Sequence, residues 1–174
     1  MIPNYLKKIL EEQEYKISYP LYPENGSTII SIRKGDYDTS FEITPKHANI
    51  DTQDMCAVLE RTILKDTITW ETEDEDGEVQ HCLMCDGIYL ASVCVYDNEI
   101  VDVHADDMSD GSAERCISYV LFTHMEDYAD VRVTIANANK EEMKLFAKFG
   151  FELDTVLPLG KTYKKKLTHV ELEL

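Results

Sequence analysis

Residues Met108–Ala113, MSDGSA, directly precede a segment with helical periodicity and carry the clearest chemical signal in the sequence. Backbone N–H groups at the start of a helix can receive an anionic group, and the positive end of the helix dipole assists them. Gly111 permits close approach of the backbone to such a group, and Ala113 keeps the next turn small. The segment is therefore compatible with a site for an anionic group.

The stretch His81–Cys85, HCLMC, contains a Cys-x-x-Cys pair with a histidine beside it, which is half of a zinc-binding pattern. A structural zinc site needs a second pair of ligands, and Cys94, His104 and Cys116 do not form one at a suitable spacing. The pair also lies in a segment with strand character. We therefore interpret the five cysteines as small core residues and expect no metal site.

Acidic residues dominate the composition, with 34 Asp and Glu against 17 Lys and Arg and a formal net charge of −17. No Lys or Arg occurs between Lys65 and Arg115, whereas four lysines gather in residues 161–166. Because like charges repel, we expect neither nucleic acid nor an anionic membrane as a partner. The charge favours a cationic substrate or a basic protein partner, and a solubilising acidic surface is the simpler alternative.

No apolar segment reaches the roughly 20 residues of a membrane helix, and the N-terminal residues lack the apolar stretch of a signal peptide. A chain of 174 residues, of which 44% are hydrophobic, is long enough for one well-packed core and short for two. We therefore expect a soluble, cytoplasmic protein with one main domain.

The elements that must position the anion site follow from the spacing of apolar and turn residues. In chain order we expect helix 3–15, strand 27–34, helix 53–66, three strands within 81–107, helix 112–128, strand 130–136, helix 139–149, and strands 150–156 and 161–174. Residues 71–80 are expected to form an acidic loop, and Asp86-Gly87 and Asp97-Asn98 two hairpin turns.

This order indicates the α+β class with a mixed α/β sheet, antiparallel in its first half and linked by helical crossovers in its second. Residues 1–26 are expected to form an N-terminal extension that includes the first helix. Residues 27–174 are expected to form a single domain.

Residues 81–168 resemble the GCN5-related N-acetyltransferase (GNAT) superfamily, which implies a GNAT-like acyl-CoA N-acyltransferase fold. The strands ending in EIVDVHADD lie where the family's fourth strand belongs, and MSDGSA matches the end of its phosphate-loop pattern. The spacing Asn139-x3-Met143-x2-Phe146-x3-Gly150-Phe151 is similar to the family's Asn…Ala…Tyr…Gly-Phe signature. Residues 28–38 are similar to its first strand, and helix 53–66 would be its substrate-side helix.

The resemblance implies acetyl-CoA as the cofactor and an amine, carried by a small molecule or by a lysine-containing protein, as the substrate. In the family, the fourth and fifth strands splay apart and the pantetheine arm inserts between them. The positions that would bind the cofactor here are Val101, Val103, Gly111, Ser112, Ala113, Asn139 and Lys144. Asn139 would either cap the following helix or bond the pantetheine.

Removal of the amine proton needs a base, and the resemblance places Glu99, Asp102 and His104 on the fourth strand. His104 suits this role because an imidazole titrates near neutrality. Simple strand alternation puts Glu99 on one face, and Ile100, Asp102 and His104 on the other. The acidic stretch favours a cationic substrate such as a polyamine, an aminoglycoside or a lysine-rich protein.

Several positions depart from the family pattern. Met108 stands where Gln or Arg usually helps to hold the phosphates, and Phe146 replaces a tyrosine that protonates the departing thiolate. Asp106, Asp107 and Asp110 add negative charge to the loop, which opposes a pyrophosphate. The basic residues available to offset these acids are Arg115, Lys140 and Lys144.

Two interpretations other than an enzyme remain open. The first is a GNAT-like fold without catalysis that acts as an acidic binding protein, either a virion component or an inhibitor of a host protein, because small acidic proteins of this pattern occur in tailed phages. The second is an α+β interaction module whose family resemblance is accidental. Related folds often dimerise through their C-terminal strands, so the resemblance leaves room for a homodimer.

Overall fold

The protein is described by a computed structural model that covers residues 2–18, 28–43 and 51–167. The helices within these residues are α1 (Asn4–Glu12), α2 (Asp51–Arg61), α3 (Ser112–Thr123) and α4 (Lys140–Ala147). The smaller sheet contains, in order, β1 (Lys16–Ser18), β2 (Thr28–Lys34) and β3 (Tyr37–Ile43). The larger sheet contains, in order, β4 (Ile68–Glu75), β5 (Glu78–Cys85), β6 (Ile88–Tyr96), β7 (Glu99–Ala105), β8 (Asp130–Ala136), β10 (Gly160–Lys166) and β9 (Glu152–Val156).

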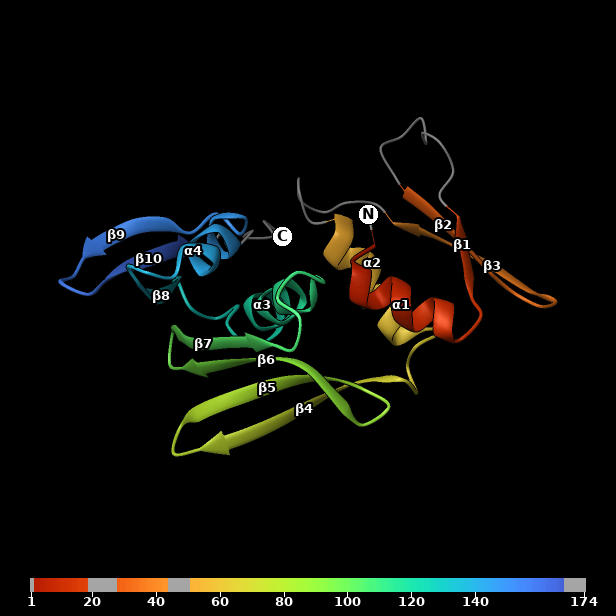
Figure 1. The fold of residues 1–174 in the computed structure, drawn as a ribbon, viewed down its shortest axis with the longest axis horizontal. Helices are drawn as coiled ribbons and strands as arrows, with labels where there is room; N and C mark the ends of the chain where they lie inside the picture. The colour runs from red at the N-terminus through yellow and green to blue at the C-terminus, as the bar shows by residue number, and fades with distance from the viewer. Residues whose placement is uncertain (1, 19–27, 44–50, 168–174) are drawn as a thin grey trace, which may run out of the picture.

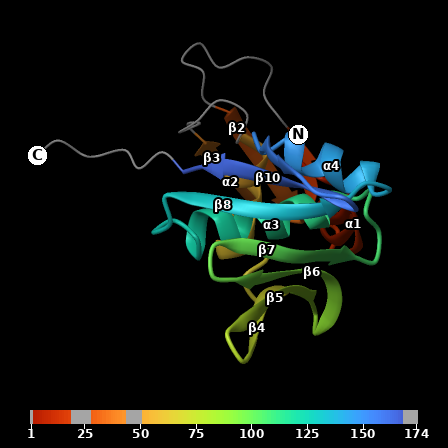
Figure 2. The ribbon, with the colours of Figure 1, turned by 90° about the vertical axis from the view of Figure 1, so that its left-hand side faces the viewer.

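The larger sheet is mixed, as the sequence predicts. Strands β4 to β7 form an antiparallel meander, and β8, β10 and β9 also pair in antiparallel fashion. The one parallel pair among the described strands joins β7 to β8, with α3 as the crossover between them. Figure 2 shows β10, β8, β7, β6, β5 and β4 following one another across the molecule.

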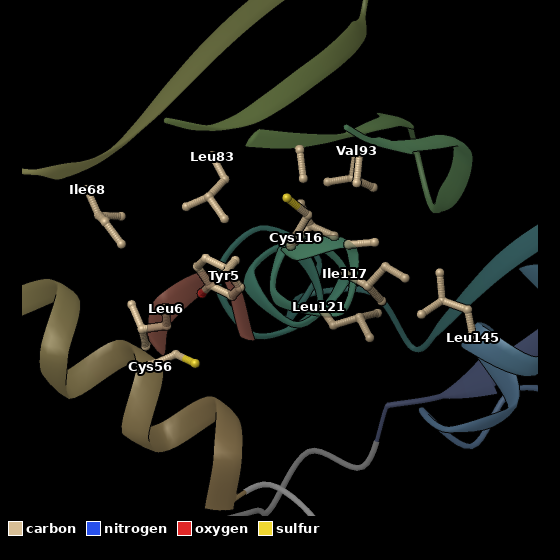
Figure 3. Packing of buried hydrophobic residues seen from close by; sticks show 14 of the residues in the cluster. Tyr5, Leu6, Cys56, Ile68, Leu83, Val93, Cys116, Ile117, Leu121 and Leu145 are labelled. Carbon is tan, nitrogen blue, oxygen red and sulfur yellow. The ribbon is translucent and has the colours of Figure 1, made fainter. Parts of the chain in front are cut away.

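Helix α3 is the centre of the packing. It lies against β5, β6 and β7 on one side and against α2 on the other, so α1, α2 and α3 all lie on the same side of the meander (Figure 1). Cys116 points from α3 toward Leu83 and Val93 of the sheet, whereas Ile117 and Leu121 lie on the side of Leu145 in α4 (Figure 3). All six side chains are buried. The opposite face of the meander carries no helix in this view (Figure 1).

The N-terminal helix is part of this core. Tyr5, Leu6, Ile9 and Leu10 recur on one face of α1 and are buried in the same cluster as α3. Strand β1 then pairs with β2, which ties the first 18 residues to the rest of the chain. The boundary expected between residues 26 and 27 lies outside the described residues.

The prediction of an acidic loop over residues 71–80 is wrong, because these residues form most of the β4–β5 hairpin. Asp76 and Gly77 make its turn, and both have positive φ angles of 53° and 89°. Trp70 and Thr72 of β4 pair with Leu83 and His81 of β5 on the α3 side, so the alternate acidic side chains of β4 face away from the core. A half-buried antiparallel strand tolerates a fully charged outer face, which is why charge alone misled the sequence interpretation.

Residues 28–38 resemble the first strand of a GNAT sheet in sequence, but they do not lie in the larger sheet. Strand β2 belongs to the smaller sheet, where it pairs with β1 and β3, and the first strand of the larger sheet is β4. The C-terminal strand expected over 161–174 is found as β10, and residues 168–174 lie outside the described part of the chain. No helix of the described residues is long and apolar enough to cross a membrane.

A buried ion pair connects α2 to α3. The Arg115 guanidinium lies 2.6 Å from Glu60 Oε2, and both side chains are less than a tenth exposed. Trp70 donates its indole N–H to the other oxygen of Glu60, at 3.1 Å. The Trp70 ring stacks on Tyr119 with a centroid distance of 3.7 Å and an interplanar angle of 3°. Glu60 is therefore fully partnered, and the pair fixes α2 against α3 and the edge of the sheet.

Replacement of Arg115 by Met should lower the free energy of unfolding by about 3–5 kcal/mol, because it leaves the Glu60 carboxylate buried without its cation. Urea unfolding followed by circular dichroism measures the change. Arg33→Met is the matched control, since Arg33 pairs with Asp38 on the surface at 69% and 56% exposure and should cost at most about 1 kcal/mol. Equal losses in the two variants would show that the buried pair does not organise the core.

A second polar group in this region is His81 of β5, which is buried beside His124 with 4.2 Å between the ring centroids. Burial lowers the pKa of His81 to about 4, and the neighbouring His124 acts in the same direction. Tyr119 lies edge-on to His81, and the Thr72 hydroxyl lies 3.4 Å from its Nδ1. The folded protein therefore holds this imidazole neutral.

Acid should destabilise the fold through His81. The unfolded chain binds a proton near pH 6.5 and the folded chain only near pH 4, so stability is complete above pH 6.5 and falls as the pH drops toward 4. His81→Gln removes this contribution, and the wild type should lose on the order of 2–3 kcal/mol more than the variant between pH 7 and pH 4. Urea midpoints measured across this range test the expectation, and parallel curves for the two proteins would contradict it.

Candidate functional site

The larger sheet opens between β7 and β8. The two strands pair only where Glu99 lies opposite Arg132 and Ile100 opposite Val133. Strand β8 pairs with β10 along its whole length, and β7 pairs with β6 from Glu99 to Ala105. Beyond Ile100 and Val133 the facing edges of β7 and β8 share no ladder position in the register. The splay between these strands, predicted from the sequence, is confirmed.

A bulge in β7 brings the three candidate bases to one face. Pairing with β6 steps from Cys94↔Asp102 to Val95↔Ile100, so Val101 has no partner. Directly paired residues of an antiparallel ladder share a face, and Ile100 therefore points into the core with Val95 while Asp102 points outward with Cys94. The alternation expected from the sequence is wrong at this point.

As a result, Glu99, Asp102 and His104 all lie on the outer face of the sheet. Their β6 partners are Tyr96, Cys94 and Ser92, which alternate with the buried core positions of that strand. Glu99 accepts a long hydrogen bond of 3.4 Å from the Thr134 hydroxyl, across the opening on β8. The bulge thus places Glu99, Asp102 and His104 in one row on the outer face of β7, whereas regular alternation would have put Glu99 on the opposite face from the other two.

His104 is held by a tyrosine that the sequence analysis did not single out. The Tyr89 hydroxyl on β6 lies 2.7 Å from His104 Nδ1, 2.9 Å from Ser92 Oγ and 3.2 Å from the His104 carbonyl oxygen. Gln80 on β5 donates to the same Ser92 oxygen at 3.2 Å. Only the register of β5, β6 and β7 brings these residues together, so no local sequence signal identifies Tyr89.

The surroundings of this row are acidic. Glu73, Glu75, Glu78, Gln80 and Cys94 line a hollow of about 180 Å³ on the outer face of β4, β5 and β6. Burial and then the carboxylate of Asp102 raise the pKa of Glu142 in α4, which places a second acid close to Asp102. The outer face therefore suits a cationic group better than an anionic one.

Two backbone N–H groups in the loop before α3, those of Ser109 and Ser112, are satisfied by carboxylates of the same loop. Asp107 Oδ1 accepts from the backbone N–H and the hydroxyl of Ser109, at 2.9 and 2.6 Å. Asp110 Oδ1 accepts from the same two groups of Ser112, also at 2.9 and 2.6 Å. The hydrogen bonds from Ser109 lower the pKa of Asp107. Two carboxylates thus occupy N–H groups that the sequence analysis expected to receive a phosphate.

Gly111 is required for a reason that the sequence does not show. Its φ angle is 89°, and a Cβ atom built there would lie 2.6 Å from Cβ of Pro3. The backbone N–H of Tyr5 donates to the Asp110 carbonyl at 3.0 Å, so the start of α1 is fastened to the loop. The close neighbour of this glycine is therefore the chain's own N-terminal segment.

The remaining positions named from the resemblance have clear structural roles. Ser112 and Ala113 are fully buried at the start of α3. Asn139 caps α4, accepting from the Glu142 N–H at 3.1 Å and donating to the Glu142 carboxylate. Of the two alternatives for Asn139, the structure shows the helix cap.

Two of the three side chains expected to offset the loop acids, those of Arg115 and Lys144, lie beside other acids. Arg115 is bound to Glu60 in the core, so the expectation that it serves the loop is wrong. Lys144 is exposed on α4 and lies 3.5 Å from Glu141. Val101 is the exposed bulge residue, and Val103 packs against the core from the α3 side.

Phe146 is fully buried and meets Phe151 edge to face, with 5.1 Å between the ring centroids. It therefore contributes packing between α4 and the sheet and offers no proton to a leaving group. Among the described residues, no group of three or more His, Cys, Asp and Glu side chains is arranged to hold a metal ion.

The described elements match solved bacterial N-acetyltransferases only distantly in sequence. The N-acetyltransferase PseH of Campylobacter jejuni is 12% identical over 71% of this chain and 84% of its own, with a TM-score of 0.46, and it was also solved in complex with acetyl coenzyme A. The ribosomal-protein-S18-alanine N-acetyltransferase of Escherichia coli is 14% identical over 66% of this chain and 81% of its own, with a TM-score of 0.45.

The spermidine N-acetyltransferase of Vibrio cholerae is 12% identical over 67% of this chain and 75% of its own, with a TM-score of 0.44. No protein-family model matches the chain, and no curated protein matches its sequence. In the larger sheet, the strand order, the parallel β7–β8 pair, its splay and the crossover helix α3 make a mixed α/β architecture. These features are the ones that the sequence resemblance implied.

Asp110→Asn should tighten the binding of free coenzyme A several-fold. The variant keeps an acceptor for Ser112 but removes a negative charge, and a charge about 4 Å from a phosphate is worth about 1 kcal/mol in water. Calorimetric titration at fixed salt gives the affinities. Asp36→Asn, in the exposed β2–β3 turn, changes the net charge equally and should leave the affinity unchanged. Equal gains in both variants, or no binding to any of the proteins, would argue against this loop as the phosphate site.

Proposed function

We propose that this protein is an acyl-CoA-dependent N-acetyltransferase that acts on a cationic amine. The observation that carries the proposal is the β7–β8 splay, because two strand edges face each other there with unpaired ladder positions. An extended chain of amide groups can add to such an edge by main-chain hydrogen bonds. The pantetheine arm of coenzyme A is a chain of this kind.

The described residues fit the two ends of acetyl-CoA unequally. The edge of β7 after Ile100 suits the pantetheine arm, and Val101 exposes an apolar side chain beside it. The loop at the start of α3 would meet the pyrophosphate with the carboxylates of Asp107 and Asp110 on its own amides. We therefore expect binding that depends on the arm and is weakened at the phosphates.

Transfer of an acetyl group to an amine requires a base for the amine proton and an opening in the sheet for the thioester. Acetyl-CoA, when bound, would supply the acyl group as a thioester, so that a C–N bond forms, the C–S bond breaks and the thiol is released. His104 would take the amine proton, since it lies on the outer face and is held by Tyr89. Glu99 and Asp102 lie in the same row and would hold the substrate's positive charge. With Phe146 buried, the departing sulfur would take its proton from solvent.

The acidic outer face supports a cationic substrate. The hollow lined by Glu73, Glu75 and Glu78 lies on the same face as His104, at the far side of β6. A polyamine, an aminoglycoside or a lysine side chain could place one amine at His104 and a second charge on this hollow. We propose that the second charge sets the preference for substrate.

A second candidate function is an acidic binding protein without catalysis. The self-satisfied loop and the contact of Pro3 with Gly111 favour it, because both occupy the place of a phosphate with the chain's own groups. In that case the acidic face of the meander would bind a basic protein through charge. Retention of a partner in a pull-down should then weaken as the salt concentration rises.

Two measurements test the enzyme against this alternative. Titration calorimetry with acetyl-CoA at up to millimolar concentration should show saturable binding, and mass spectrometry should detect acetylation of a panel of polyamines, aminoglycosides and lysine peptides. His104→Asn should lower kcat by about 10²–10⁴-fold while acetyl-CoA still binds. His124→Asn, at the exposed end of α3, is the control and should remain active. The enzyme proposal fails if the wild type neither binds acetyl-CoA nor acetylates any amine.

A further inference from the structure

The Tyr89 hydroxyl meets more partners than it has protons. A tyrosine hydroxyl donates one proton and accepts through its oxygen lone pairs. Around it lie His104 Nδ1 at 2.7 Å, Ser92 Oγ at 2.9 Å and the His104 carbonyl oxygen at 3.2 Å. How the protons are shared among these atoms decides which nitrogen of His104 is left free.

The carbonyl oxygen of His104 can only accept, so its hydrogen bond with Tyr89 uses the tyrosine's single proton. Ser92 Oγ already accepts from Gln80 at 3.2 Å and can also accept from Tyr89. Both oxygens therefore offer the tyrosine proton an acceptor on the side away from the ring. A lone pair of the Tyr89 oxygen is then available to His104 Nδ1, which must carry a hydrogen to use it.

The network is fixed in place by packing. Ser92 is 3% exposed, and Gln80 and Tyr89 are half-buried around it, while His104 is exposed. The Tyr89 and His104 rings lie 5.7 Å apart at an interplanar angle of 32°. The hydroxyl therefore lies at Nδ1 of an exposed ring, and Nε2 is the nitrogen that it does not contact.

We infer that Tyr89 is a positioning residue that holds neutral His104 in the tautomer with hydrogen on Nδ1 and a free lone pair on Nε2. The catalytic meaning of this inference rests on the proposed function, in which Nε2 receives the amine proton. When Nε2 is protonated, Nδ1 keeps its hydrogen and its bond to Tyr89. No hydrogen bond of the network has to be remade during the proton transfer.

The tautomer is measured directly by nuclear magnetic resonance on protein labelled with ¹⁵N-histidine, at a pH well above the roughly 6.5 at which an ordinary imidazole titrates. The wild type should show a protonated Nδ1 and an unprotonated Nε2 for His104. Tyr89→Phe should return the ring to the mixture of a free imidazole, in which hydrogen on Nε2 predominates. Tyr37→Phe, a tyrosine exposed in the smaller sheet, should leave the signals unchanged. Hydrogen on Nε2 in the wild type, or an unchanged tautomer in Tyr89→Phe, would overturn the inference.

Kinetics supply an independent readout. Tyr89→Phe should lower kcat by about tenfold with little change in the KM for the amine, and it should have no further effect in a His104→Asn background, because Tyr89 acts only through His104. An undiminished loss in that background would sink the inference even with the enzyme proposal intact. If the tautomer is as stated but the protein neither binds acetyl-CoA nor acetylates any amine, the enzyme proposal fails while the assignment of the His104 tautomer to Tyr89 stands.

Discussion

The short parallel contact between β7 and β8 is the constraint on which the rest of the structure depends. Among the described strands, only two ladder pairs join the meander to the C-terminal strands, Glu99 with Arg132 and Ile100 with Val133. Ile100 and Val133 are both buried at this point, so the join is secured by the core under α3 as well as by hydrogen bonds. The sheet can open beyond it because each half is fully paired on its other side, to β6 and to β10.

The bulge at Val101 turns this opening into a site. It lets Ile100 remain in the core while Asp102 and His104 face outward together with Glu99. Without the bulge, regular alternation would place Ile100, Asp102 and His104 on the same face of β7, so either Ile100 would leave the core or the two polar side chains would enter it. The same shift also sets the register that puts His104 beside Ser92, and therefore within reach of Tyr89.

The sequence predicts local features of this arrangement well and distant ones poorly. Asp86-Gly87 predicts a turn, and the periodicity of residues 112–128 predicts a helix that is found as α3 over Ser112–Thr123, because these signals are contained in neighbouring residues. Strand β4 was missed because its outer acids resemble a loop, although Asp76-Gly77 carries the same turn signal as Asp86-Gly87. The splay followed from the family resemblance, since no single segment encodes it.

The candidate site was predictable only in part for the same reason. Glu99, Asp102 and His104 lie close together in sequence, so the resemblance could name them together. They share a face only because of the bulge at Val101, which no residue pattern in the strand predicts. Tyr89 and His104 are 15 positions apart and meet through strand register. Pro3 lies near the N-terminus and Gly111 in the middle of the chain, and they come into contact only in the folded protein.

The β7–β8 opening and the loop before α3 differ in what they offer an anionic ligand. The opening between β7 and β8 offers unpaired strand edges. In the loop before α3, by contrast, the Ser109 and Ser112 N–H groups already donate to Asp107 and Asp110. Hydrogen bonds to charged groups contribute roughly 1.5–3 kcal/mol each, so a pyrophosphate must displace interactions of the same kind that it would form. The net gain at the loop is therefore small. Under the proposed function, the affinity for coenzyme A derivatives would therefore come chiefly from the arm between β7 and β8 rather than from the glycine loop.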